Sequence, residues 1–427
     1  MRTNIPEVSA LSTNVNSMFK ELYSVAGTTP RTLCTIGDSR IAMGYVQAPL
    51  ANYFVDNGFL QWALGFAGVD VKILNSAATS GYNLDQMIAS FSTGVLPYNP
   101  TDVLIMGFTN ELMLYTPSTS ALLQVAYDTI SAKLKVLYDL CLNAGYFMHI
   151  VSETANDTLS ADRRKLINPL NEFTREYCRQ NPAFAYYSDA YSVTVDPASA
   201  TGGMLSSITY DGLHVNNLGA FKIGQVVAAS FLTRFPLIQL PKGQYESKNV
   251  NNQSKNILKN PMLQGTTGVI DVGTSGTLPT DWQAYSHAAD SSVMSIVAAD
   301  TVGNAINMAY NVAAARTFVL ISGDVYSINS PQKNLYAVCR IKCTAAGQLL
   351  GCQFTFNSNA SASSIWGNPS AAARVPLPAG WTITIKTPVC VSNNTISVLK
   401  LKLNMMFAAA DSTTVLKVEG FALYQDV

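Results

Sequence analysis

Charged residues, histidines and long apolar runs are all scarce in this sequence. Only 13% of the 427 residues are charged, and 27 basic residues balance 27 acidic ones to a formal net charge of zero. That balance, with no basic cluster among aromatic residues, argues against nucleic acid and anionic membranes as partners. No apolar run reaches the ~18 residues of a membrane span, and the first ~25 residues lack the charged-then-apolar pattern of a secretory signal.

Several motifs that mark other enzyme classes are also absent. The chain has no Gly-x-Ser-x-Gly elbow, His-Glu-x-x-His zinc helix, Walker loop or Gly-x-Gly-x-x-Gly fingerprint. Metallohydrolase, nucleotide-binding and standard α/β-hydrolase functions therefore lack their signatures. The seven cysteines include no Cys-x-x-Cys pair. Cys339 and Cys343 could form a ligand pair, but the alternation around them predicts a strand with two buried thiols on one face. We expect no metal or other cofactor.

One short β-rich run is followed by a hydroxyl side chain. The run Thr32–Ile36 leads into Gly37-Asp38-Ser39, so Ser39 is predicted to lie just beyond the carboxyl end of a strand, where open α/β sheets bind ligands. Taken alone, this tripeptide is equally typical of a turn or a helix N-cap. Ser39 is the candidate nucleophile.

The sequence contains three histidines, one of which must be the base for this nucleophile. His149 lies in the apolar run 146–151 and is predicted to be a core or strand-end residue, and His287 belongs to the C-terminal half. His214 remains, with Asp211 three positions before it. Asp211 can accept from one ring N–H and so fix the tautomer that frees the other nitrogen. The alternative is that Asp211 only forms a turn before the next helix.

Two further strand-like runs end in residues that could stabilise an oxyanion. The run 69–74 gives way to small residues and Gly81, where the absence of a side chain lets backbone amides approach closely. The run 102–106 leads to Asn110, whose side-chain amide can donate to the same oxygen. We therefore expect amides at Ser39 and Gly81 and the Asn110 side chain to form an oxyanion hole.

With these residues in place, the sequence resembles the SGNH hydrolases, also called the GDSL esterase and lipase superfamily, over residues 30–235. Their four blocks match Gly37-Asp38-Ser39, Gly81, Asn110 and the pair Asp211 and His214. The resemblance implies a three-layer α/β fold with a parallel sheet. It also implies a catalytic triad of Ser39, Asp211 and His214 and an oxyanion hole at Ser39, Gly81 and Asn110.

Two blocks depart from the family pattern. The third block usually reads Gly-x-Asn-Asp, whereas this chain has Gly107-Phe108-Thr109-Asn110, so either the glycine has slipped by one position or Phe108 occupies its place. The second block has one more residue before Gly81 than the family pattern leads us to expect. The identity of the oxyanion amide there stays open.

The pattern of periodicities divides the chain into segments. An apolar stripe over residues 7–26 predicts an N-terminal helix (1–28), which packs on its own domain or on a partner chain. Residues 29–240 form the predicted hydrolase domain, with helices expected at 119–143 and 162–179 and strands at 146–151 and 184–189. Residues 241–260 are polar and predict a linker that separates the catalytic blocks from the rest.

The C-terminal half (261–427) has short β-rich runs instead of helical periodicity. An antiparallel β-sandwich is predicted from runs at 317–322, 335–343, 350–357, 381–386, 395–407 and 414–424. Its opening, residues 260–282, resembles the start of jelly rolls like carbohydrate-binding modules, including those that end phage tail fibres and spikes. Four aromatic residues could stack on sugars or fill the core: Trp282, Tyr285, Trp366 and Trp381.

These features together favour a serine esterase. We expect it to hydrolyse short acyl esters, above all O-acetyl groups on a polysaccharide, because an appended sandwich and a low charge suit a bulky neutral glycan. An extracellular or virion-associated location, such as a phage tail deacetylase that assembles with itself or into a virion, fits the same features. The alternatives are a lipid or small-ester esterase, a non-catalytic glycan-binding module and a structural tail protein.

Overall fold

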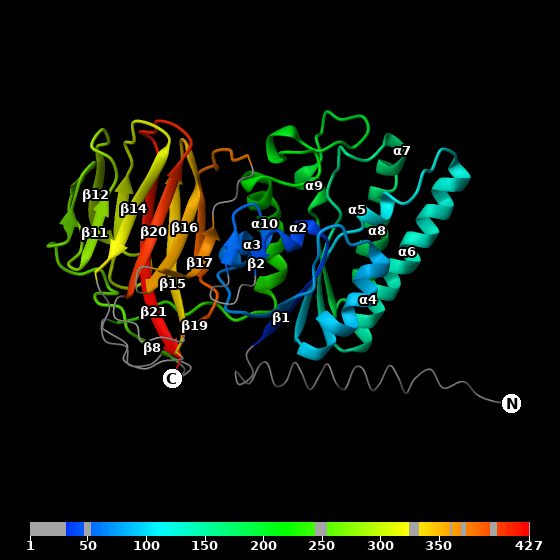
Figure 1. The fold of residues 1–427 in the computed structure, drawn as a ribbon, viewed down its shortest axis with the longest axis horizontal. Helices are drawn as coiled ribbons and strands as arrows, with labels where there is room; N and C mark the ends of the chain where they lie inside the picture. The colour runs from blue at the N-terminus through cyan, green and yellow to red at the C-terminus, as the bar shows by residue number, and fades with distance from the viewer. Residues whose placement is uncertain are drawn as a thin grey trace.

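The computed structural model describes residues 31–46, 53–243, 254–323, 333–358, 361–368, 373–392 and 399–426. The predicted N-terminal helix lies outside these residues. Figure 1 shows an α/β part beside a part made of β-sheets. Within the described residues, no helix has both the length and the apolar character needed to span a membrane.

The α/β part is built on a five-stranded parallel sheet. Its strands follow the order β4-β1-β5-β6-β7. Their bounds are Thr32–Gly37 (β1), Lys72–Ser76 (β4), Asp102–Met106 (β5), Phe147–Val151 (β6) and Ala185–Ser188 (β7). The helices are α2 (Ser39–Ala42), α3 (Phe59–Ala67), α4 (Leu84–Gly94), α5 (Thr109–Leu112), α6 (Ser120–Asn143), α7 (Ala161–Arg164), α8 (Ile167–Gln180), α9 (Tyr191–Thr194) and α10 (Asn217–Leu232), with 3-10 turns η1 (Leu96–Tyr98) and η2 (Ser206–Ile208).

Alternation along these strands creates three layers. Leu33 and Leu104 point to one face of the sheet and belong to the core that includes α3 and α10. Cys34 and Val103 point to the other face, into a core with α4, α6 and α8. Successive strand residues face opposite sides, so the buried runs supply both cores at once. The predicted α/β fold with a parallel sheet is confirmed.

The helix predicted at 162–179 is two helices in the structure. The short helix α7 ends at Arg164, and α8 starts at Ile167. Pro169 lies at the third position of α8, where the missing N–H would have no helical partner. Further inside a continuous helix the same ring would clash with the carbonyl four residues earlier. The proline therefore sets where α8 can begin.

The β part contains two eight-stranded sheets. The first contains β8 (Ser254–Asn256), β10 (Thr274–Gly276), β12 (Ser292–Ala298), β13 (Asn304–Ala309), β15 (Lys333–Ala345), β18 (Trp381–Lys386), β19 (Cys390–Ser392) and β21 (Val415–Asp426). The second contains β2 (Tyr45–Val46), β3 (Tyr53–Val55), β9 (Val269–Ile270), β11 (Trp282–Tyr285), β14 (Arg316–Ser322), β16 (Leu349–Ser358), β17 (Ser361–Asn368) and β20 (Leu399–Phe407).

Most strand pairs of the β part are antiparallel, as predicted. In β20, Leu399, Leu401 and Leu403 are buried while Lys400 and Lys402 are half-buried, which is the alternation of a strand with one face on a core. The pairs β10 with β12, β9 with β11 and β3 with β17 are parallel. The thiols of Cys339 and Cys343 are buried and free, as their alternation predicts.

The structure divides the chain differently from the sequence pattern. Residues 254–256, inside the predicted linker, form β8 and pair with β21. Leu258 is buried in the core. Conversely, β2 and β3 come from the predicted hydrolase segment but join the second sheet of the β part, where β3 pairs with β17. Such long-range pairing leaves no mark on local periodicity.

The tryptophans considered for sugar stacking are core residues. Trp282, Trp366 and Trp381 are only 2%, 1% and 4% exposed, so sugar stacking is wrong for these three. Their rings are buried because each completes the packing between layers, which local sequence does not reveal. Tyr285 is half-buried.

Helices α3 and α10 form the layer between the parallel sheet and the β part (Figure 1). Trp62 of α3 lies at its centre, with ring centroids 5.3 Å from Phe221 of α10, 5.5 Å from Trp366 and 6.3 Å from Trp381. The backbone of α10 comes close because Gly224 has no side chain; a Cβ there would lie 2.4 Å from that of Trp62. One continuous core therefore extends through both parts.

We predict that Trp62→Ala lowers the free energy of unfolding by about 3–5 kcal/mol, because it removes a buried indole from a closely packed site. Urea unfolding followed by circular dichroism and by tryptophan fluorescence measures this. Leu232→Ala, at a residue of α10 that is 54% exposed, is the control and should shift the midpoint little. Equal stability of Trp62→Ala and the wild type would contradict the shared core.

Candidate active site

Three side chains meet beyond the carboxyl end of β1. Ser39 is the first residue of α2, directly after the strand, and its Oγ lies 2.8 Å from Nε2 of His214. On the other side of the ring, His214 Nδ1 lies 2.6 Å from Oδ2 of Asp211. The fold thus brings together a hydroxyl, an imidazole and a carboxylate in the order that nucleophilic catalysis requires.

The Asp211 carboxylate is held by its own turn. The backbone amides of Leu213 and His214 donate to Oδ1 at 2.9 and 2.6 Å, which leaves Oδ2 for His214 Nδ1. Gly212 adopts a φ of +83° that favours glycine. Burial raises the pKa of Asp211, but the hydrogen bonds from His214 and the two amides outweigh it and hold that pKa below its ordinary value. The ionised carboxylate accepts from Nδ1–H and leaves Nε2 free to take the serine proton.

The segment 209–216, here named the histidine loop, is fixed by further contacts. The ring of Tyr210 stacks on that of His214, with centroids 5.9 Å apart and planes at 15°. Thr209 Oγ1 donates to the carbonyl of His214 at 2.6 Å, and the amide of Asp157 donates to the carbonyl of Gly212 at 2.8 Å. The imidazole is thereby held at a defined orientation.

The predicted oxyanion donors follow three neighbouring strands, β1, β4 and β5. Within the described residues, the backbone amides of Ser39 and Gly81 make no hydrogen bond. Gly81 has a φ of +86°, and a Cβ there would meet no atom within 4 Å. Asn110 Nδ2 donates to the carbonyl of Tyr82 at 3.0 Å, which uses one of its two hydrogens. The two backbone amides and the second hydrogen of the Asn110 side-chain amide therefore have no partner among the described residues and are free to donate.

A buried guanidinium, that of Arg40, binds the carboxylate of the residue that precedes Ser39. Arg40 Nε donates to Asp38 Oδ1 at 3.0 Å, and Nη2 bonds the other oxygen of that carboxylate. Nη1 and Nη2 both bond the carboxylate of Glu153, which follows β6, and Nη1 donates to Thr154 Oγ1 at 3.0 Å. The backbone amide of Phe108 donates to Glu153 Oε2 at 2.8 Å. Removing one partner would leave a buried charge unpaired, at a cost of about 3–5 kcal/mol.

The network also fixes the residues of the third block. Gly107 has a φ of +120°, and a Cβ there would lie 2.5 Å from Asp38 Oδ2. Only glycine fits at position 107, directly against the Asp38 carboxylate. Phe108, the next residue, contributes its backbone amide to Glu153.

Two buried glutamates were not among the candidates from sequence. Glu153 stands two residues after the apolar run of β6, and a carboxylate at the carboxyl end of a buried strand is the signal that could have identified it. Glu111 accepts from the backbone amide of Leu84 at 3.2 Å and from Lys133 Nζ at 2.9 Å. It therefore anchors the start of α4 and the helix α6.

A second Ser–His–Asp arrangement lies in the core of the α/β part. His149 Nδ1 is 3.0 Å from Ser230 Oγ, and its Nε2 is 3.3 Å from Asp102 Oδ1. All three residues are completely buried, and Asp102 starts β5, at the amino ends of the strands, whereas Ser39 follows the carboxyl end of β1. Burial lowers the pKa of His149 against the opposing effect of Asp102. The prediction of a core histidine is confirmed.

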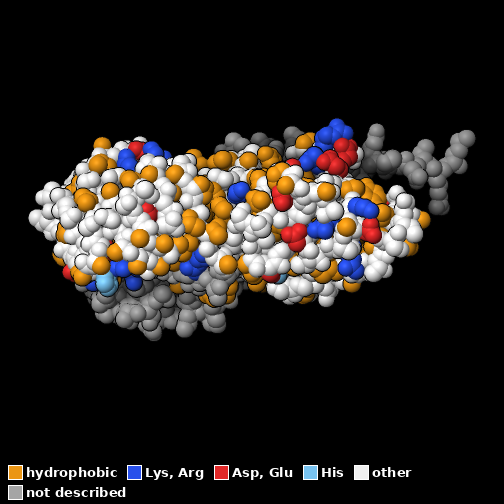
Figure 2. Space-filling view, turned by 90° about the horizontal axis from the view of Figure 1, so that it is seen from above, with side chains coloured by type: hydrophobic (Ala, Val, Ile, Leu, Met, Phe, Trp, Pro, Cys, Tyr) orange, Lys and Arg blue, Asp and Glu red, His pale blue; other side chains and the backbone are white. Residues whose placement is uncertain are grey.

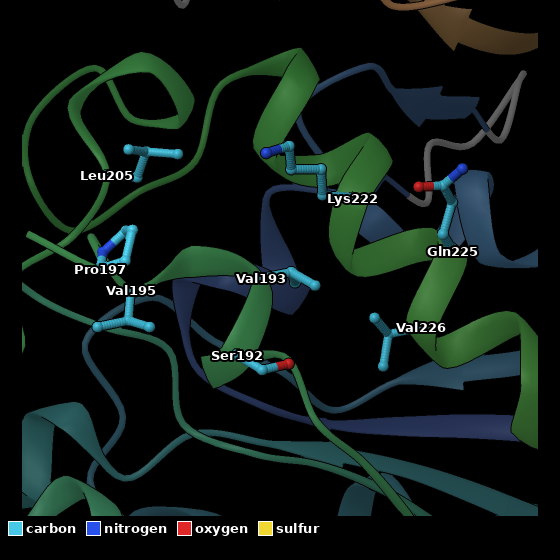
Figure 3. A pocket seen from close by; sticks show the side chains of 8 residues that line it. All are labelled: Ser192, Val193, Val195, Pro197, Leu205, Lys222, Gln225 and Val226. Carbon is cyan, nitrogen blue, oxygen red and sulfur yellow. The ribbon is translucent and has the colours of Figure 1, made fainter.

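Two of the three triad side chains reach the surface, while Ser39 is nearly buried. Ser39 is 9% exposed, while the His214 and Asp211 side chains are 20% and 39% exposed. A hollow of about 590 Å³ lies elsewhere, between α9, the segment 195–205 and α10. Figure 3 shows its lining, which includes Lys222 and Val226 of α10 but no triad or oxyanion residue. Among the described residues, no group of three or more His, Cys, Asp or Glu side chains is arranged to hold a metal ion.

Comparison with known proteins gives matches only among solved structures. No family model and no curated protein matches the chain. A GDSL-like lipase from Bacteroides thetaiotaomicron is 14% identical, with 51% of this chain and 98% of that chain covered and a TM-score of 0.35. An acetylxylan esterase from Geobacillus stearothermophilus is 14% identical (49% and 97% covered, TM-score 0.35), and another acetyl xylan esterase is 16% identical (47% and 98%, TM-score 0.35). The assignment of the site therefore rests on its geometry.

We predict that Ser39→Ala and His214→Ala each reduce ester hydrolysis by several orders of magnitude, because each removes one half of the nucleophile–base unit. Turnover of p-nitrophenyl acetate measures this, with circular dichroism to verify folding. Ser192→Ala, on the exposed surface of α9, is the matched serine control. Near-wild-type turnover by either active-site variant would rule out the triad.

For Asn110→Ala we predict a loss of about 10²–10³ in kcat with little change in KM, because a hydrogen bond to the oxyanion is strongest in the transition state. Asn110→Asp should lose at least as much, since it places a negative charge facing the oxyanion. Steady-state kinetics on a small ester separate the two constants. A change confined to KM would instead make Asn110 a substrate-binding residue.

Proposed function

We propose that this protein is a serine esterase. The observation that carries the proposal is the continuous chain of contacts from Ser39 Oγ to His214 Nε2 and from His214 Nδ1 to Asp211. In the proposed reaction, His214 takes the hydroxyl proton while Ser39 attacks the ester carbonyl. The proton then passes to the leaving alcohol as the acyl-enzyme forms, and a water activated by His214 releases the acid.

The proposed substrate is a short acyl ester, above all an O-acetyl group, on a polysaccharide. Two features support this. The His214 and Asp211 side chains are 20% and 39% exposed, so an ester on a bulky polymer can approach the site from solvent, and the hollow beside α9 and α10 has none of the three triad residues in its lining. The view in Figure 2 has scattered charges and no broad area of Lys and Arg side chains, which suits a neutral glycan.

A lipid or small-ester esterase is the second candidate. Met43 caps the helix that carries Ser39 and is 39% exposed, so the helix of the candidate nucleophile presents an apolar side chain to solvent, which would suit an apolar acyl group. We place the enzyme outside the cell or on a virion, where acylated polysaccharide would be accessible, as in a phage tail deacetylase. A non-catalytic glycan-binding or structural role would leave the unpartnered oxyanion donors without a purpose.

We predict that the protein releases acetate from acetylated polysaccharides. We also expect it to hydrolyse p-nitrophenyl acetate at least about tenfold faster than a long-acyl ester, a ratio that requires a difference of about 1.4 kcal/mol in transition-state binding. An enzymatic acetate assay on a panel of bacterial glycans measures the first activity. The Ser39→Ala protein is the control for spontaneous hydrolysis. A preference for long acyl chains would favour the lipid esterase, and no turnover of any ester would favour a binding or structural protein.

A further inference from the structure

Asn217 is a buried polar residue that the proposed reaction does not use. It is the first residue of α10, three positions after His214. Among the described residues, its side chain bonds to the β part alone: Nδ2 donates to the carbonyls of Leu350 and Val375, each at 2.8 Å, and Oδ1 accepts from the amide of Val375 at 2.9 Å. Both amide hydrogens and the carbonyl oxygen of Asn217 are therefore engaged by the β part.

The short chain between His214 and Asn217 gives the two residues little freedom to move relative to each other. Only Val215 and Asn216 lie between them, and both are buried. Val215 forms a bridge with Thr209, and Asn216 caps α10 by accepting from the amides of Leu218 and Gly219. The bonds of Asn217 thus hold the C-terminal end of the histidine loop against the β part.

The nucleophile is connected to the same part of the molecule. The chain leaves α2 through β2 and β3, and β3 pairs with β17, with Tyr53 opposite Ile365. Arg374, the neighbour of Val375, forms an ion pair with Asp56 at 2.8 Å. Both segments that carry the catalytic pair therefore run directly into elements bound to the β part.

We propose that Asn217 is a positioning residue through which the β part sets the orientation of His214 toward Ser39. This inference rests on the proposed esterase function. A displacement of about 1 Å in a catalytic group can cost roughly 10²-fold in rate. The β part is then a component of the catalytic unit, in contrast to the separable module that the polar segment 241–260 predicts.

The test compares Asn217→Ala with Lys386→Met in the full-length protein. Lys386 forms an ion pair with Asp70, which precedes β4 and so lies at the amino ends of the parallel strands, whereas Ser39 lies beyond their carboxyl ends. Both changes remove a contact between the two parts, but only Asn217→Ala reaches the histidine loop. We expect Asn217→Ala to lower kcat on p-nitrophenyl acetate about 10- to 100-fold with KM within about twofold. Lys386→Met should keep both constants within about twofold.

Two further variants make the result decisive. Asn217→Asp keeps the size but removes both donated hydrogens, so its kcat should fall at least as far. Asn217→Ser keeps one hydroxyl donor, should lose less, and serves as the test if Asn217→Ala does not fold. A folded Asn217→Ser or Asn217→Ala protein with wild-type kcat, or an equal loss in Lys386→Met, would overturn the positioning role.

Labelling of Ser39 by a fluorophosphonate separates this inference from the function on which it rests. A wild-type protein that neither turns over esters nor reacts with the probe would refute the esterase itself. A wild-type protein that reacts, with Asn217→Ala reacting equally fast, would refute only the positioning role. We expect Asn217→Ala to react about 10- to 100-fold more slowly, because the probe also requires a correctly oriented base.

Discussion

The buried guanidinium of Arg40 links the strand ends on which the candidate site is built. It binds the carboxylates of Asp38, after β1, and Glu153, after β6, while Glu153 also accepts from the amide of Phe108, after β5. Three neighbouring strand ends are thus tied to one buried cation. Because a buried charge tolerates neither loss nor displacement of its partners, the backbone around Ser39 has little freedom to shift.

The other residues of the candidate site lie on short segments that follow the strands or come from a distant loop. Ser39, Gly81 and Asn110 follow adjacent strands, so their positions are set by the parallel register. His214 comes from a loop far along the chain, and its position depends on contacts that the sheet does not provide. The turn around Asp211 orients the ring locally, and the start of α10 sets where that turn lies.

The layer of α3 and α10 explains why the two parts of the protein cannot be considered separately. One face of this layer covers the parallel sheet, and the other packs on tryptophans of the β part. A helix layer that is apolar on both sides must be covered on both sides. The β part supplies that cover. The pairing of β3 and the bonds of Asn217 extend the same contact to the carboxyl ends of the strands, where the candidate site lies.

Local pattern in the sequence was enough for the parallel sheet, most long helices and the roles proposed for Ser39, Asp211 and His214, because a strand followed by glycine and a carboxylate three residues before a histidine are short-range features. The Arg40–Glu153 pair, the burial of Trp366 and Trp381, the pairing of β3 with β17 and the bonds of Asn217 were decided only by tertiary structure. Each joins residues more than a hundred positions apart or depends on which surfaces meet. Local periodicity carries no record of such partners, so only the folded chain reveals them.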